Sequence, residues 1–202
     1  MEIIKNNKGF TLIELLLMMI VIGIMAITAI GSYISTAENF TFLSDFNALT
    51  ETFKRARLLA IHSVDMDTID RYGIELKKTG SSPNFTYSVL IFGDVSTGTP
   101  YEYETGVDTI IFDSEHTFDS DFEFSMSKPT GTTTNYYFYY ENGTGDFTAY
   151  YSPSGTPILL PKVDVVNRYL QINFNTIDNS ITRYILISQI SGLAESFREA
   201  KI

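Results

Sequence analysis

The chain has 202 residues, of which 24 are acidic and 14 basic, so its formal net charge at neutral pH is −10. This charge repels phosphate backbones and disfavours nucleic acid as a primary partner. The absence of cysteine excludes disulfides, thiolate nucleophiles and Cys-ligated metal centres, and two histidines leave little material for a His-rich metal site. The length allows one ordinary domain plus an extra element.

An apolar block of 25 residues, 10–34, carries a single charged side chain, Glu14, and is long enough to cross a bilayer as a helix. Twelve Phe, Leu, Ile or Val residues in its first 22 positions contribute about −4 to −7 kcal/mol of insertion free energy. One acid, at roughly +3 kcal/mol, does not cancel this. Lys5 and Lys8 precede the block, which predicts a cytoplasmic amino terminus and an outward-facing remainder.

A glycine stands before this block, whereas an ordinary secretory signal carries its small residues after the apolar core. The stretch KGFTLIELL, residues 8–16, resembles the type III leader of type IV pilins and type II secretion pseudopilins. The resemblance implies that a membrane peptidase cuts between Gly9 and Phe10 and methylates the new amine of Phe10. It also implies that Glu14 is the acid that this family carries five residues into the mature chain. The alternative is a plain signal anchor.

Glu14 lies where an unpaired carboxylate is costly, so we expect it to meet a cation. In the assembly scheme that the resemblance implies, the freed amine of Phe10 from one subunit reaches Glu14 of another. At about 4 Å and an effective dielectric near 20, this attraction is worth roughly 4 kcal/mol before desolvation, enough to set the register of the helices. The alternative is a carboxylate that only sits near the headgroups.

Gly23 and Gly31 are the weak points of the apolar helix, since each costs up to about 1 kcal/mol relative to alanine. We predict an extended stretch near Gly31, where many members of the resembled family carry a proline. Close contact between helices through these small residues is an equally good interpretation.

Apolar residues recur at three- and four-residue spacing from Phe40 to Ala60, so the helix is predicted to continue to about His62. Beyond it, short alternating or aromatic runs separated by Gly, Pro and Asn clusters predict strands and no second helix. The expected strands are 72–77, 85–92, 109–112, 122–126, 136–140, 147–151, 169–174 and 181–188. The predicted fold class is α+β, with a long N-terminal helix packed on an antiparallel β-sheet domain, the pilin fold.

Four segments follow from this organisation. They are a leader at 1–9, a transmembrane and assembly helix at 10–34, an amphipathic helix at 35–63 that packs on the globular domain, and a β-rich domain at 64–202.

Two later stretches are similar to the GspH/FimT-like minor pilins. FKRARLLAIHS with YGIEL resembles that family's helix end and first strand, and YYSPSGTPILL with ITRYILISQISGL resembles its aromatic turn and its last strand, here ending at Gly155 and Gly192. Some members carry a basic pair after the last glycine that contributes to DNA capture, but Leu193 and Ala194 stand here. DNA is therefore not an expected partner, and Arg198 with Lys201 is interpreted as a solvated helix end.

Asp65, Asp67 and Asp70 form a D-x-D-x-x-D run after the helix, and such oxygen ligands suit calcium. The run lacks the glycine turn and the distal glutamate of an EF-hand, so a solvated loop is favoured and no metal or other cofactor is predicted. The acidic stretch 113–123 is interpreted as an exposed turn.

Enzymatic activity is not expected. No G-x-S-x-G, Walker, dinucleotide-binding or H-E-x-x-H motif occurs. His62 and His116 have no Ser or acid at nucleophile spacing.

The run from Tyr136 to Tyr140 places aromatics on both faces of one strand. One face suits the core, and the other, with Tyr137 and Tyr139, is a candidate surface for subunit contacts or adhesion. The alternative is full burial between two sheets.

The resemblance implies a structural subunit of a type IV pilus or a type II secretion pseudopilus, of the minor GspH/FimT-like kind that initiates, caps or decorates the fibre. The alternatives are a major pilin that forms the shaft and a filament-tip adhesin. The expected partners are other pilin subunits, the prepilin peptidase and the membrane, contacted by residues 10–34. Before assembly the chain is expected to cross the cytoplasmic membrane once, and afterwards to stand in an extracellular or periplasmic filament.

Overall fold

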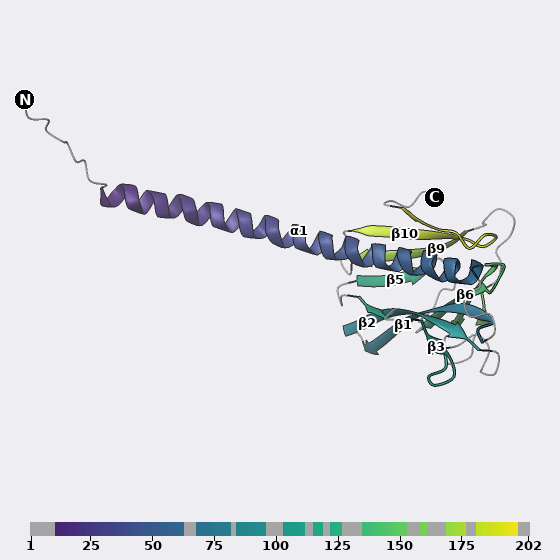
Figure 1. The fold of residues 1–202 in the computed structure, drawn as a ribbon. Helices are drawn as coiled ribbons and strands as arrows, with labels where there is room; N and C mark the ends of the chain where they lie inside the picture. Colours follow the sequence, from purple (N-terminus) through teal and green to yellow (C-terminus); the bar gives the residue numbers. More distant parts are fainter. Residues whose placement is uncertain are drawn as a thin grey trace, which may run out of the picture. The chain divides into compact units, whose positions relative to one another are not determined.

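The computed structural model describes residues 11–62, 68–81, 84–95, 103–111, 115–118, 122–126, 135–152, 158–160, 169–176 and 181–197. The chain divides into two compact units, residues 1–41 and 42–202. Within the described residues one helix, α1 (Leu12–Ile61), is followed by strands only (Figure 1). The predicted α+β fold with a single long helix is confirmed.

The strands form two antiparallel sheets in the second unit. Sheet 1 has the order β3-β2-β1-β6-β7-β8, with β4 also paired to β2, and sheet 2 has the order β11-β10-β9-β5. The strand bounds in sheet 1 are β1 Arg71–Ser81, β2 Asn84–Asp94, β3 Thr109–Ile110, β4 His116–Thr117, β6 Asn135–Glu141, β7 Phe147–Ser152 and β8 Ile158–Leu159. Those in sheet 2 are β5 Phe122–Met126, β9 Tyr169–Thr176, β10 Thr182–Ser188 and β11 Ala194–Phe197.

The carboxyl-terminal strand β11 is a finding that the sequence pattern did not predict. We expected the last strand to end before Gly192, yet the chain turns there and pairs back on β10. Gly192 has a φ of +65°, a left-handed conformation that suits glycine, and its amide donates to the Ser188 carbonyl at 2.7 Å. The turn therefore closes a hairpin, while Arg198 and Lys201 lie outside the described residues.

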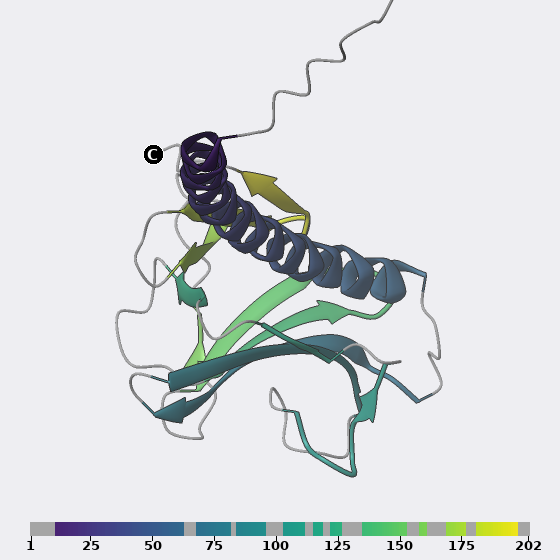
Figure 2. The same ribbon diagram turned by 90° about the vertical axis from the view of Figure 1, so that its left-hand side faces the viewer.

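One face of the second half of α1 forms the centre of the main core. Its buried residues repeat every three or four positions, and they are Phe42, Phe46, Leu49, Phe53, Ala56 and Ala60. The Phe42 ring stacks on Phe174 of β9 at 4.8 Å between centroids, and Phe53 meets Phe138 of β6 edge-on at 5.0 Å. This stretch thus packs on both sheets, and Figure 2 shows it passing over their strands.

The opposite face of sheet 1 carries a second, smaller core. It contains Leu90, Phe92, Tyr137, Tyr139 and Tyr150, with Tyr103 packed against it. The Phe92 ring lies over Gly73 of β1 so closely that an added Cβ would stand 2.2 Å from it. The far end of the Phe92 ring therefore occupies the space that a Cβ at position 73 would take.

Candidate functional site

The start of α1 is a capping box built from Thr11 and Glu14. The Glu14 amide donates to the Thr11 hydroxyl at 3.3 Å, and the Glu14 carboxylate accepts both the Thr11 amide and its hydroxyl at 3.0 Å. This reciprocal arrangement satisfies amides that a helix start leaves without partners. Glu14 thus has a local role that the sequence analysis did not identify.

The first half of α1 presents apolar side chains all round its circumference. Among the described residues α1 alone contains a stretch long and apolar enough to cross a membrane, and none of that stretch is buried. Every large apolar residue from Leu12 to Ile30 is at least 47% exposed in the chain. A helix with no polar face requires an apolar environment, which is a bilayer or neighbouring apolar helices.

The predicted extension near Gly31 is not present. Residues on both sides of Gly23 and Gly31 are helical, and an added Cβ at either glycine would meet nothing within 4 Å. The reason is energetic, because a cost of about 1 kcal/mol at an isolated glycine does not break a helix made otherwise of good helix formers. Both glycines leave the helix surface open to an approaching partner.

Several predicted site residues lie outside the described residues, namely Gly9, Phe10, Asp65 and Asp67, so cleavage and the Asp run remain predictions. Asp70 is described and exposed. Its amide donates to the Asp94 carbonyl at 3.0 Å, and its carbonyl accepts the Asn142 amide at 3.2 Å. Among the described residues, no group of three or more His, Asp or Glu side chains is placed to hold a metal ion.

The proposed contact surface at Tyr137 and Tyr139 is wrong. Tyr137 is 4% exposed and Tyr139 is fully buried in the second core, where Tyr139 meets Phe92 edge-on at 5.8 Å. The alternative of full burial between two sheets is correct for the burial. Among the described residues, the covering group on this face is Tyr103, which precedes β3 and packs on Phe92. The signal for this burial is that Gly73 lies opposite both Phe92 and Tyr139 in the sheet. The sequence shows that pairing only when the strand register is known.

His116 is placed differently from expectation. It begins β4, and its Nε2 lies 3.0 Å from Asp45 Oδ1 on α1, 71 residues away. The His116 ring also meets Phe118 edge-on at 4.8 Å. The stretch interpreted as an exposed acidic turn therefore includes an edge strand and a buried Phe118. His62 follows the end of α1, where the helix was predicted to end, and it is exposed.

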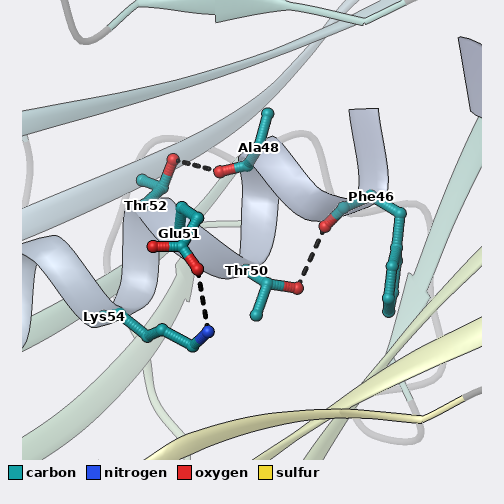
Figure 3. A network of polar contacts seen from close by, with 6 residues as sticks. All are labelled: Phe46, Ala48, Thr50, Glu51, Thr52 and Lys54. Carbon is teal, nitrogen blue, oxygen red and sulfur yellow. Dashed lines mark hydrogen bonds and ion pairs between the residues drawn. The ribbon is translucent and has the colours of Figure 1, made fainter. Parts of the chain in front are cut away.

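The second half of α1 carries local polar contacts, some buried and some exposed (Figure 3). The Thr50 hydroxyl donates a hydrogen bond to the Phe46 carbonyl at 3.0 Å, and the Thr52 hydroxyl donates one to the Ala48 carbonyl at 2.9 Å. Lys54 forms an ion pair with Glu51 at 2.8 Å. An open groove beside them is lined by Ala48, Glu51, Thr52, Lys54, Arg55, Leu58 and Ile91. Exposed pairs of this kind contribute little free energy, so the groove has no evident chemistry.

A cluster of acids around Arg71 is a feature that the sequence analysis missed. Asp94 at the end of β2 is 3% exposed, and its Oδ2 lies 3.1 Å from Arg71 Nε on β1. Burial raises the pKa of Asp94 to about 6, the Arg71 charge opposes the rise, and Asp108, Asp70 and Glu141 add to it. Burial likewise raises the pKa of Asp108, against two backbone hydrogen bonds.

Comparison with protein families, with curated proteins and with solved structures finds no match to this chain. The resemblance to pilins therefore rests on residues 8–16 and on a fold of one long apolar N-terminal helix with antiparallel sheets, which is compatible with a pilin-like architecture.

Proposed function

We propose that this chain is a prepilin-class subunit that is cut after Gly9, held in the membrane by the first half of α1 and drawn into a pilus or pseudopilus as a minor subunit. The observation that carries the proposal is the contrast within α1. Its first half exposes apolar residues on every side, while its second half buries one face in its own domain. A soluble protein would gain nothing from a helix of the first kind.

The motif supplies the second support. A lysine, a glycine, an aromatic residue and an acid stand at fixed spacing at the front of the apolar block in the sequence. Thr11 and Glu14 begin the helix directly after the proposed cut. Cleavage between Gly9 and Phe10 would leave the new amine one residue before the cap.

The cleavage is tested with Gly9→Ala. The variant is expected to accumulate as an uncut membrane precursor, which intact-mass spectrometry distinguishes from a mature chain that begins at Phe10. A mature chain of unchanged mass in the variant would refute the cleavage assignment.

The role of Glu14 is tested with two substitutions that separate its charge from its cap. Glu14→Ala removes both, whereas Glu14→Gln keeps an oxygen for the Thr11 donors and removes the charge. Both variants are expected to insert in the membrane and to fail in incorporation into filaments. Normal incorporation of Glu14→Gln would show that the charge is not required.

A minor subunit and a shaft-forming major pilin differ in abundance. Quantification of purified, sheared filaments is expected to find this chain as a trace component. A dominant band would support the major-pilin alternative. The adhesin alternative loses its basis, because the aromatic face on which it depended is buried.

A further inference from the structure

The segment 103–111 begins with Tyr103 on the outer face of sheet 1 and ends in β3 and Ile111. Ile111 is buried in the main core and donates its amide to the Ile91 carbonyl at 3.0 Å. The Tyr103 ring lies 5.3 Å from Phe92, and β3 pairs with residues 92–93 of β2. The Asp108 carboxylate accepts the Val95 amide at 3.2 Å and the Glu104 amide at 2.8 Å. The buried Asp108 carboxylate therefore links Val95, which directly follows β2, to Glu104 near the start of the segment.

Asp94 lies close to the Asp108 carboxylate of this segment. It is the last residue of β2, directly before the Val95 amide that Asp108 holds. The charged groups that face its carboxylate are Arg71 on β1, Asp108 from the segment, Asp70 before β1 and Glu141 on β6. The phenol of the buried Tyr139 on β6 is the titratable neutral group beside them. One cation therefore faces three further acids around a carboxylate that has almost no access to water.

We propose that residues 103–111 form a pH-dependent clasp that is closed most tightly when Asp94 is protonated and loosens when Asp94 ionises. Ionised Asp94 lies in a desolvated place and repels the Asp108 carboxylate that closes the clasp. Opening the segment hydrates Asp94 and moves Asp108 away. Ionisation and opening therefore favour each other by linkage.

The direction and the size of the pH effect on opening follow from the surroundings of Asp94 in the closed and open forms. In the closed form the pKa of Asp94 is raised to about 6. In the open form, where Asp108 has moved away and water reaches the carboxylate, this pKa falls toward its ordinary value of about 4. The closed form therefore binds the proton more tightly, and the opening equilibrium rises between about pH 4 and pH 6 and then levels. The difference of about two pH units limits the rise to about a hundredfold.

Hydrogen–deuterium exchange of the full chain in neutral detergent micelles tests the clasp, with rates corrected for the intrinsic effect of pH. Peptides that cover residues 95 and 103–111 are expected to open ten- to a hundredfold more often at pH 7.5 than at pH 4.5. Peptides from the β10–β11 hairpin serve as the internal reference and are expected to show no change. A flat profile for the segment in the unmodified chain would overturn the proposal.

Asp94→Asn is expected to remove the part of the pH dependence that Asp94 contributes, because it retains the shape of the side chain and cannot ionise. The part that remains comes from Asp108, whose pKa burial also raises. Asp146→Asn is the matched control, since Asp146 is exposed in the β6–β7 turn and is expected to leave the profile unchanged. A full pH dependence in Asp94→Asn would contradict the proposal.

If far-UV circular dichroism shows that Asp94→Asn does not fold, the exchange experiment is repeated with Glu141→Gln. Removal of that neighbouring anion is expected to move the midpoint of the transition to lower pH. An unmoved midpoint would count against the clasp.

Discussion

The two halves of α1 have the same secondary structure and opposite surroundings. From Leu12 to Ile30 the large apolar side chains are 47–84% exposed, whereas the core-facing residues from Phe42 to Ala60 are at most 1% exposed. The second half gains its stability from packing on its own sheets, while no residue of the first half from Leu12 to Ile30 is part of a buried core among the described residues. Both halves are thus helical, but only the second half is shielded from solvent by other parts of the same chain.

The largest effect is expected from a cavity in the packed half. Phe53→Ala removes a fully buried ring that meets Phe138, and it should lower the free energy of unfolding by about 3–5 kcal/mol. Denaturant titration in detergent, followed by near-UV circular dichroism, measures this loss. Leu16→Ala in the exposed half is the matched control and should change the value by under about 0.5 kcal/mol. Equal losses would erase the contrast between the halves.

A pH effect of intermediate size is expected from Asp94, which lies in the packed unit. Since its pKa is raised to about 6 in the folded chain, the folded state binds the proton more tightly than the unfolded state does. The free energy of unfolding should therefore fall by up to about 3 kcal/mol from pH 4 to pH 6 and level above that. Thermal melts across this range, compared with those of Asp94→Asn, measure the difference. A variant that retains the whole decrease would assign it to another group.

The two kinds of glycine sharpen the comparison further. In sheet 1, Gly73→Ala would place a Cβ against the Phe92 ring, which must shift, and a loss of about 1–3 kcal/mol is expected. Melting temperature and near-UV circular dichroism record this change. A neutral result would mean that the second core repacks freely.

The smallest effect is expected at Gly23 in the exposed half. The site is open, so Gly23→Ala should raise helix stability by up to about 1 kcal/mol. Far-UV circular dichroism of the full chain in micelles, as a function of temperature, measures this gain. Loss of filament incorporation with unchanged helicity would instead identify Gly23 as a contact point between helices.

Local patterns predicted most of the elements correctly. The long apolar and amphipathic periodicity defined α1 almost to its ends, and alternation identified the longer strands from β1 to β10. The two-residue strands β4 and β8 and the short β11 were not predicted, because so few residues show no period and form strands only beside a neighbour that is distant in sequence. The exposed face assigned to Tyr137 and Tyr139 failed for a related reason, since alternation separates two faces without saying what covers them.

The sequence by itself determined the fold class, the apolar character of the first half of α1 and the motif around Glu14, because these depend on composition and spacing along a short stretch. Only the tertiary structure decided that both faces of β6 are buried, that His116 meets Asp45 and that Asp94 lies among three acids and one arginine. These features depend on strand register and on contacts between residues far apart in the chain, which local periodicity does not encode.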